Sequence, residues 1–316
     1  MKIQIYCICL CISLCLIQCN RGEQTTESGK SRIAFVMKTM NNPFFIRMQE
    51  GAEEAARQHE VDVIVQAPDR ELDVERQMQI IENLIQTQVD VLCITPSGSR
   101  EIIPAIARAN QANIPVIIVD TRVDEDAAQA AGISTAAFIG SDNYQGGVLA
   151  GQHVVNHFHA DTEIAILEGV PGHETADSRL QGFRDGIKDA PHIRIVSSQP
   201  ANAERDLGFN VTQNMLQTNP GIKAIFAIND MMALGAVEAI AAAGKTGDIM
   251  VIGFDAVDEA KQAIRNGSMT GSIAQFPYDM GKIAIETSVK ILQGESVPQS
   301  IPVKIELITR ENLEES

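Results

Sequence analysis

Asparagine, aspartate, arginine and glutamine gather in short loops spread along the chain, and each loop follows an apolar run. These loops are Asn41-Asn42-Pro43-Phe44-Phe45, Asp120-Thr121-Arg122, Asn229-Asp230-Met231, Gly253-Phe254-Asp255 and Gln275. Carboxylates and amides form paired hydrogen bonds, and arginine presents a rigid fork of donors. Such groups match vicinal hydroxyls, so they favour reversible binding of a small polyhydroxylated molecule.

Helix capping is the competing explanation for these loops. Asn42 is a suitable N-cap, and Pro43 suits the first helical position. Capping explains any single Asn or Asp, but it does not explain Phe44 beside Phe45. Helix neighbours differ by about 100°, so both rings cannot face the core equally. We expect one ring to point across the strand ends, where it can stack on the C–H face of a sugar.

The elements that carry these loops alternate between strand and helix. The expected strands are Ile33–Met37, Val61–Val65, Val89–Ile94, Val116–Val119, Ala136–Ile139, Glu163–Leu167, Ile193–Ser197, Ala224–Ala227, Met250–Gly253 and Thr270–Ala274. Continuous apolar strands are typical of parallel sheets covered on both faces. Between them the apolar period becomes helical, as at Phe45, Met48, Ala52 and Ala55. The pattern predicts an α/β fold of two doubly wound parallel sheets, each with five strand–helix units. Ligands of such sheets bind at the carboxyl ends of the strands, where the polar loops lie.

Longer stretches identify a family resemblance. They are Asn41-Asn42-Pro43-Phe44-Phe45, Ala109-Asn110-Gln111-Ala112-Asn113-Ile114-Pro115-Val116-Ile117, Gly140-Ser141-Asp142-Asn143, Asn229-Asp230-Met231-Met232-Ala233-Leu234-Gly235-Ala236, Gly253-Phe254-Asp255 and Ile273-Ala274-Gln275. From about Arg32 to Thr309 the chain resembles the ribose-type periplasmic sugar-binding proteins of ATP-driven (ABC) uptake systems. The resemblance implies the type I periplasmic-binding-protein fold, in which two lobes joined by three crossovers close on a monosaccharide.

Carried over by position, the resemblance implies a set of ligand-binding residues. They are Asn42, Phe44, Phe45, Asp120, Arg179, Asn229, Asp255 and Gln275. The ribose proteins have Asn where Thr95 stands, so Thr95 is a possible ligand-binding residue. They have Arg where Thr121 stands, so Arg122 is a candidate substitute from one residue further on. Their second stacking aromatic falls at Ala203. The run ending in His173 resembles galactose- and glucose-binding relatives, so His173 is either a ligand or a solvated loop residue. These departures put ribose itself in doubt.

The lobes implied by the resemblance are discontinuous in sequence. We expect residues 31–141 and 276–304 to form the N-terminal lobe, and residues 142–275 and 305–316 to form the C-terminal lobe. Residues 1–19 are expected to be an export signal, because a charged start precedes an apolar stretch too short to span a bilayer. Residues 20–30 are expected to be a polar tether.

Leu16-Ile17-Gln18-Cys19 resembles a lipoprotein lipobox, in which Cys19 is acylated. Gln18 departs from that pattern, and a plain signal peptide cut nearby is the alternative. Either way we expect the folded part outside the cytoplasm, in the periplasm or on the outer face of the cytoplasmic membrane. After the signal only Cys93 remains, in an apolar run that favours a buried core thiol.

Charge and motifs exclude several classes of function. The formal net charge is −16, and scattered acidic residues repel phosphate backbones, so we expect no nucleic-acid partner. A repressor of the lactose type would need a DNA-binding segment where the export signal stands. No nucleophile elbow, phosphate loop or zinc helix is present, so we expect no enzyme, cofactor or metal. A glycosidase using Asp120 and Asp255 is less favoured, because each is better used as a hydroxyl acceptor.

The prediction is therefore a monomeric binding protein that captures a sugar or polyol and delivers it to ABC transporter membrane subunits. Pentoses such as ribose rank first, hexoses second and polyols third. A sugar receptor for chemotaxis or a sensor kinase is the alternative, because both roles use the same closing lobes. Contact with the membrane is expected through the lipid anchor only.

Overall fold

Two six-stranded sheets carry the fold of this computed structural model, which describes residues 29–315. The first sheet contains β1 (Arg32–Val36), β2 (Asp62–Gln66), β3 (Val91–Ile94), β4 (Val116–Val119), β5 (Ala137–Ser141) and β11 (Ser300–Val303). The second contains β6 (Thr162–Glu168), β7 (Ile193–Pro200), β8 (Ile222–Ala227), β9 (Met250–Asp255), β10 (Gly271–Ala274) and β12 (Glu306–Thr309). The strand orders are β11-β5-β4-β3-β1-β2 and β12-β10-β9-β8-β6-β7. All pairs are parallel except β10 with β12. The predicted doubly wound fold is confirmed.

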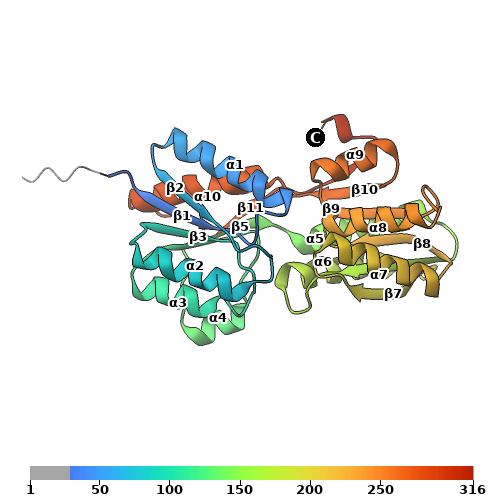
Figure 1. Ribbon diagram of the computed structural model, residues 1–316, viewed down its shortest axis with the longest axis horizontal. Helices are drawn as coiled ribbons and strands as arrows, with labels where there is room; N and C mark the ends of the chain where they lie inside the picture. The colour runs from blue at the N-terminus through green and yellow to red at the C-terminus, as the bar shows by residue number, and fades with distance from the viewer. Residues whose placement is uncertain (1–28, 316) are drawn as a thin grey trace, which may run out of the picture. The chain divides into compact units, whose positions relative to one another are not determined.

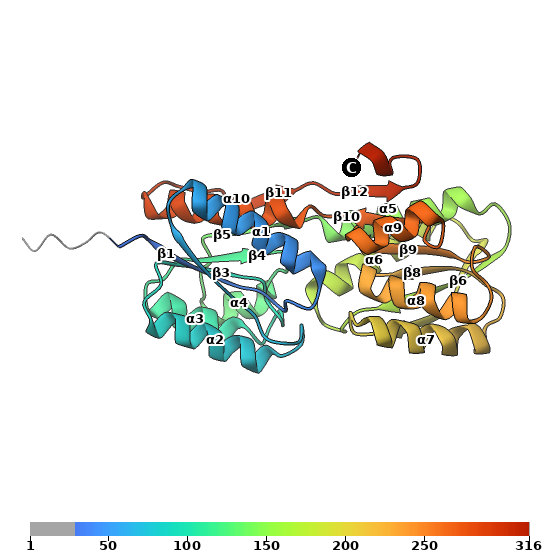
Figure 2. The same ribbon diagram turned by 45° about the horizontal axis from the view of Figure 1, so that its top comes forward.

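Helices cover both faces of each sheet (Figure 1). They are α1 (Pro43–Gln58), α2 (Val74–Gln86), α3 (Ile103–Gln111), α4 (Glu125–Ala131), α5 (Asn143–His157), α6 (Glu174–Ile187), α7 (Arg205–Thr218), α8 (Asp230–Ala242), α9 (Asp258–Asn266) and α10 (Pro277–Leu292), with a short 3₁₀ turn, η1 (Leu313–Glu315), at the end. The first sheet with α1–α4 and α10 is the first lobe. The second sheet with α5–α9 is the second lobe (Figure 2).

Strand alternation divides the core of the first lobe between two faces. Ile33 and Phe35 on β1 belong to the apolar cluster that contains Met48 of α1. Ala34, which lies between them, belongs to the cluster that contains Ile81 of α2. Successive strand residues point to opposite faces, so one apolar strand supplies both layers. The residues whose spacing predicted this helix are buried in α1, namely Phe45, Met48, Ala52 and Ala55.

In the second lobe, successive residues of β9 also point to opposite faces of the sheet. A Cβ added to Gly253 would meet Ala233 of α8, whereas the ring of Phe254 approaches Gly146 of α5. Gly253 therefore faces α8, and its neighbour Phe254 faces α5. Helices α5 and α6 pack side by side, as do α7 and α8.

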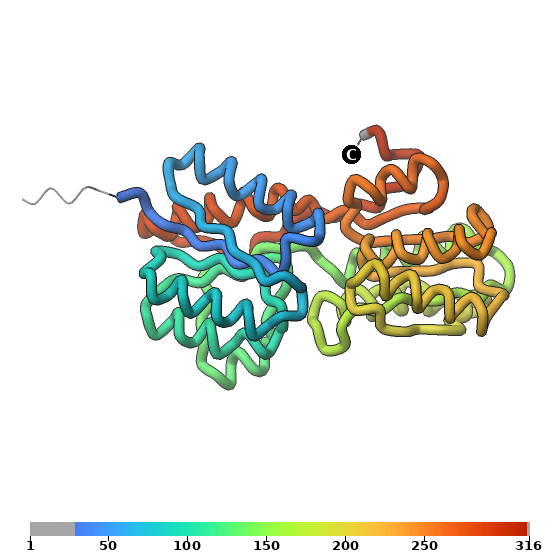
Figure 3. Tube along the Cα trace, viewed as in Figure 1, coloured from blue at the N-terminus to red at the C-terminus, as the bar shows by residue number. Residues whose placement is uncertain are grey.

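Three chain segments connect the lobes, and Figure 3 traces them. The first lies between β5 and α5, the second between β10 and α10, and the third between β11 and β12. The second segment contains Phe276, whose φ of +57° is in the left-handed region. The Nζ of Lys304, in the third segment, lies 4.0 Å from the centroid of the Phe276 ring. The second and third segments are thus in contact.

All ten strands expected from the sequence are present, with ends shifted by a few residues, whereas β11 and β12 were not expected. Both have four residues, and β11 contains Pro302. Each pairs at the edge of its sheet, β11 on β5 and β12 on β10. Pairing on an existing edge, rather than local apolar pattern, makes them strands.

Within residues 29–315 no helix has the length and apolar character needed to cross a membrane.

Close approach of α1 and α10 generates a test of the fold. A Cβ added to Gly281 would lie 1.9 Å from the Met48 carbonyl oxygen. Gly281→Ala should lower the free energy of unfolding by about 2–3 kcal/mol through overpacking, although Ala normally stabilises a helix by about 1 kcal/mol relative to Gly. Chemical denaturation measures the change. The exposed α10 change Lys290→Ala is the control, and equal stability of Gly281→Ala and this control would contradict the packing.

Candidate binding cleft

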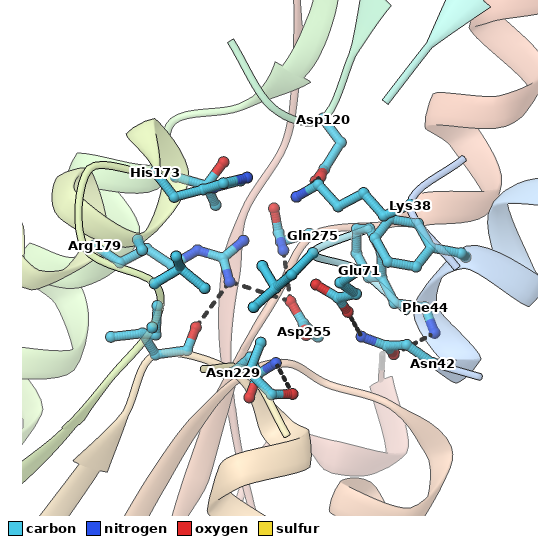
Figure 4. A pocket seen from close by; sticks show the side chains of 18 residues that line it. Lys38, Asn42, Phe44, Glu71, Asp120, His173, Arg179, Asn229, Asp255 and Gln275 are labelled. Atoms are coloured by element: carbon cyan, nitrogen blue, oxygen red, sulfur yellow. Dashed lines mark hydrogen bonds and ion pairs between the residues drawn. The ribbon is translucent and has the colours of Figure 1, made fainter. Parts of the chain in front are cut away.

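A polar cleft lies where the carboxyl ends of the two sheets face each other (Figure 4). It encloses about 540 Å³ not occupied by protein atoms, part of it open to solvent. Its lining residues are Lys38, Asn42, Phe44, Phe45, Glu71, Leu72, Asp120, Gly169, Val170, His173, Thr175, Ala176, Arg179, Ala203, Ile228, Asn229, Asp255 and Gln275. All eight residues expected to bind the ligand are among them, together with His173.

Asn42 positions the aromatic wall on the first lobe. Its Oδ1 accepts from the backbone N–H of Phe44 at 3.0 Å, which caps α1, and its Nδ2 donates to Glu71 Oε1 at 3.0 Å. Phe44 and Phe45 are both 3% exposed, and their ring centroids lie 5.3 Å apart at 90°. Both rings line the cleft, whereas the sequence indicated one. Capping and cleft lining are therefore performed by the same loop.

Lys38, Glu71 and Asp120 form the charged part of the first-lobe wall. Lys38 Nζ lies 3.5 Å from Asp120 Oδ2, and both side chains are nearly fully buried. Burial raises the pKa of Glu71, and the positive charge of Lys38 opposes that rise. A buried carboxylate is stable only if it is paired or hydrogen-bonded. Lys38 and Asn42 supply those interactions here.

Arg179 organises the second-lobe wall. Its Nε donates to Asn143 Oδ1 at 2.8 Å, and its Nη1 donates to the Ile228 carbonyl at 2.8 Å. The guanidinium carbon lies 3.8 Å from the centroid of the Phe254 ring, and Nη1 lies 3.5 Å from Asp255 Oδ1. A guanidinium fixed on this many sides presents its donors in one geometry.

Gln275 leaves one polar atom without a partner in the cleft. Its Nε2 donates to Asp255 Oδ1 at 2.7 Å. Its Oε1 is buried and accepts no hydrogen bond from the described part of the chain. An unsatisfied buried carbonyl costs about 1–3 kcal/mol. A hydroxyl that donates to this oxygen would remove that cost.

Asp230 supports Asp255 from beneath the cleft. Its Oδ1 accepts from Ser272 Oγ at 2.6 Å, and its Oδ2 accepts from the Val257 N–H at 2.9 Å. Ser272 Oγ in turn accepts from the Ala256 N–H at 3.0 Å. Burial raises the pKa of Asp230 to about 7, against its hydrogen bonds with Ser272 and Val257. Burial likewise raises the pKa of Asp255, although Arg179 lowers it. Asp230 and Ser272 therefore hold the backbone after Asp255 in place, through the N–H groups of Val257 and Ala256.

The start of α6 makes the contacts between the lobes. Thr175 Oγ1 donates to Thr121 Oγ1 at 3.1 Å, and the Glu174 N–H donates to Ser99 Oγ at 3.1 Å. The His173 ring hydrogen-bonds to the backbones of Pro96 and Ser97 in the first lobe. His173 is the N-cap residue of α6, yet its side chain makes no cap hydrogen bond. Its imidazole is used for contact between the lobes, and the structure is a closed form.

Two candidates, Thr95 and Arg122, are not among the residues that line the cleft. Thr95 is fully buried, with its Oγ1 3.9 Å from Met48 Sδ, so it belongs to the core. Arg122 stacks on Phe138, 3.7 Å from the ring centroid to the guanidinium carbon, and lines other surface grooves. Arg122 therefore does not replace the arginine missing at Thr121.

Lys38 and Glu71 line the cleft but were not expected to. Lys38 follows β1 closely, and Glu71 lies in the loop after β2. Both are at carboxyl ends of strands in the first sheet, which is the signal that identified the other residues. Applied to every strand, the same rule would have found them. Ala203 lines the cleft as expected, and the phenyl rings on the cleft are those of Phe44 and Phe45.

Among residues 29–315 no group of three or more His, Cys, Asp or Glu is arranged to hold a metal ion. Cys93 is buried in the core, with Sγ 3.4 Å from Ser288 Oγ. Burial raises the pKa of the Cys93 thiol to about 12, so the thiol is inert as a nucleophile. Cys19 lies outside the described residues.

A polar cleft at the carboxyl ends of two doubly wound sheets is where such folds bind their ligands. The periplasmic binding protein domain family matches residues 33–296. The chain is 35% identical to the ribose import binding protein RbsB of Escherichia coli (strain K12), over 90% of this chain and 92% of that one. It is 33% identical to the D-allose-binding periplasmic protein of the same strain, over 90% and 94%.

A solved structure supports the same conclusion. The periplasmic solute-binding protein of an ABC transporter from Actinobacillus succinogenes 130z, with bound D-allose, superposes with a TM-score of 0.87 at 38% identity. The match covers 91% of this chain and 100% of that chain. The chain belongs to the periplasmic binding protein family. It is a solute-binding protein and not an enzyme.

The environment of His173 predicts a pH effect on stability. Burial, and then the charges of Lys38 and Arg179, lower the pKa of His173 from 6.5 to about 3. The folded state thus binds this proton more weakly than the unfolded state. The contribution of neutral His173 to the free energy of unfolding is complete above about pH 6.5. It is lost as pH falls toward 3, by at most about 1.4 kcal/mol per pH unit.

Denaturation of wild type and His173→Gln between pH 4.5 and 8 measures this effect (roughly the window where one imidazole titrates). Asp230 and Asp255 titrate in the opposite sense, because their folded-state pKa values are raised. The informative quantity is therefore the difference between the two proteins, which should grow in acid. His59→Gln, at an exposed site outside the cleft, is the matched control. A constant difference across the range would contradict the buried, neutral imidazole.

Proposed function

We propose that the chain captures a monosaccharide between its lobes and delivers it to the membrane subunits of an ABC importer. Pentoses such as ribose rank first, hexoses such as allose second and related polyols third. The observation that carries the proposal is the unpartnered Gln275 Oε1 beside Asp255, in a cleft with two phenyl rings on the opposite wall. Names of the relatives support it, since the proteins they describe bind ribose and allose.

Each wall of the cleft has a separate task in this proposal. Phe44 and Phe45 pack against the C–H face of the ring, and carboxylates accept from its hydroxyls. Arg179 and Lys38 donate to ring or hydroxyl oxygens. A ligand that touches both lobes binds the closed form more tightly than the open form, so it shifts the equilibrium toward closure.

Calorimetry and thermal shift against D-ribose, D-arabinose, D-allose, D-glucose, D-galactose and myo-inositol test the proposal. A ligand at 100 times its Kd adds about 2.7 kcal/mol of stability by mass action. The best sugar should raise the melting temperature and compact the protein in small-angle scattering. No shift with any of these compounds, together with a shift by an amino acid or a nucleoside, would show that the cleft serves another ligand.

Gln275→Ala tests the assignment of the cleft. The substitution removes a ligand acceptor and the donor to Asp255, so binding of the best sugar should weaken by about 1–3 kcal/mol. Calorimetry measures the loss, and Gln293→Ala at the exposed end of α10 is the matched control. Unchanged affinity in Gln275→Ala would place the site elsewhere.

Export and anchoring are proposed from the N-terminal sequence. We expect Cys19 to carry acyl groups after signal cleavage and to hold the protein at a membrane surface outside the cytoplasm. Intact mass and detergent phase partition test this. Wild type should enter the detergent phase, and Cys19→Ala should remain in the aqueous phase. Cys15→Ala, in the same segment, should behave as wild type. If the mass of the wild-type protein showed no acyl groups, the anchor would be contradicted and a plain signal peptide would remain the explanation.

A further inference from the structure

A buried amide on α2, that of Gln77, reaches the backbone just beyond two neighbouring strands of the first sheet. Its side chain is fully buried and does not line the cleft. Its Nε2 donates to the Met37 carbonyl, directly after β1, at 3.1 Å and to the Thr95 carbonyl, directly after β3, at 2.9 Å. Its Oε1 accepts from the Ser97 N–H at 2.8 Å. The nitrogen and the oxygen of this amide are therefore both used on the backbone at the carboxyl ends of the strands.

The loop between β3 and α3 receives the first turn of α6 from the other lobe. The His173 ring hydrogen-bonds to the backbones of Pro96 and Ser97 in this loop. The Glu174 N–H donates to Ser99 Oγ, in the same loop, at 3.1 Å. Both contacts join the lobes in the closed form, so both depend on where the loop lies.

Gln77 fixes the part of this loop that His173 contacts. It bonds to Thr95 on one side of Pro96 and to Ser97 on the other. The hydroxyl of Ser97 is buried, and no group in residues 29–315 hydrogen-bonds to it. The side chain of Ser97 therefore does not anchor the loop, whereas the backbone bond to Gln77 does.

The same amide also fixes the backbone that precedes Lys38. Met37, whose carbonyl accepts from Gln77, is the preceding residue in the chain. Lys38 Nζ lies 3.5 Å from Asp120 Oδ2 on the cleft wall. One side chain outside the cleft thus connects a charged part of the cleft wall with the loop that the facing lobe contacts.

We propose that Gln77 is a positioning residue for ligand capture, because it holds the loop after β3 where His173 meets it in the closed form. Without this amide, two carbonyls and one N–H lose a buried partner, and buried backbone groups must be paired. A displaced loop would give α6 a poorer surface to contact. Ligand affinity includes the free energy of closure, so the ligand would be held less tightly. The inference rests on the proposed function, since capture by closure is the step that Gln77 supports.

A double-mutant cycle with calorimetry tests this role, using whichever of D-ribose and D-allose wild type binds more tightly. The variants are Gln77→Met, which keeps the length of the side chain and removes its hydrogen-bonding groups, His173→Gln, and the two together. Gln77→Asn keeps an amide that is one methylene shorter, and it is a milder second variant if Gln77→Met folds poorly. Ile81→Ala is the control, because this buried residue of the same helix contributes apolar packing and no side-chain hydrogen bond.

Gln77→Met should weaken binding by about tenfold or more, and Gln77→Asn by less. Ile81→Ala should bind within about threefold of wild type, although denaturation will show that it is less stable. In the His173→Gln background, the Gln77 substitution should cost at least about threefold less affinity than in wild type, because both residues act through one contact.

Two results would overturn this inference and leave the proposed function intact. One is a loss of affinity in both Gln77 variants no greater than in Ile81→Ala, which would make Gln77 a residue of stability alone. The other is an equal loss in the presence and absence of His173, which would show that Gln77 does not act through the loop. Binding of neither sugar by wild type would overturn the proposed function, and this inference with it.

Discussion

The second-lobe wall depends on the hydrogen bonds of one buried guanidinium. Arg179 joins α6 to the first residue of α5 through Asn143, to the end of β8 through Ile228, and to the end of β9 through Asp255. Four elements that are distant in sequence thus meet at one side chain. Truncation would remove the positive charge beside the Asp255 carboxylate and the Arg179 donors to Asn143 Oδ1 and the Ile228 carbonyl. Buried groups that lose such partners cost more than the bond itself contributed. The residue supports the lobe as well as the ligand.

Part of the backbone strain lies at the same cleft and in the crossover that follows β10. Asp120, Ala203, Asp255 and Phe276 have φ values of +65°, +64°, +116° and +57°. Each costs of order 1–3 kcal/mol and persists only where the surroundings hold it. For Asp255 the supporting groups are Asp230 and Ser272, which fix the next two backbone N–H groups. The Asp120 and Asp255 side chains line the cleft from these backbone conformations, and extended or helical backbone would direct them elsewhere.

Polar contacts between the two lobes hold the cleft in its closed form. The first turn of α6 contacts loops of the other lobe through Glu174 and Thr175, and His173 does so through its ring. These contacts are few and polar, so the closed form gains little apolar burial from them. A closed form held by weak contacts is one that a ligand can stabilise further, which is what reversible capture and release require.

The sequence by itself determined the fold class, ten of the twelve strands in residues 29–315 and most of the cleft lining. It did so because parallel strands buried on both faces must be apolar, and because their carboxyl ends collect the polar loops. Tertiary structure decided the rest. β11 and β12 are strands because an edge was available to pair with, and Thr95 points into the core because of its place in a buried loop. Arg122 stacks on Phe138 and does not line the cleft, and the His173 ring hydrogen-bonds to the backbone of the facing lobe. Such partners lie far apart in sequence, so only the packing of the two lobes could select them.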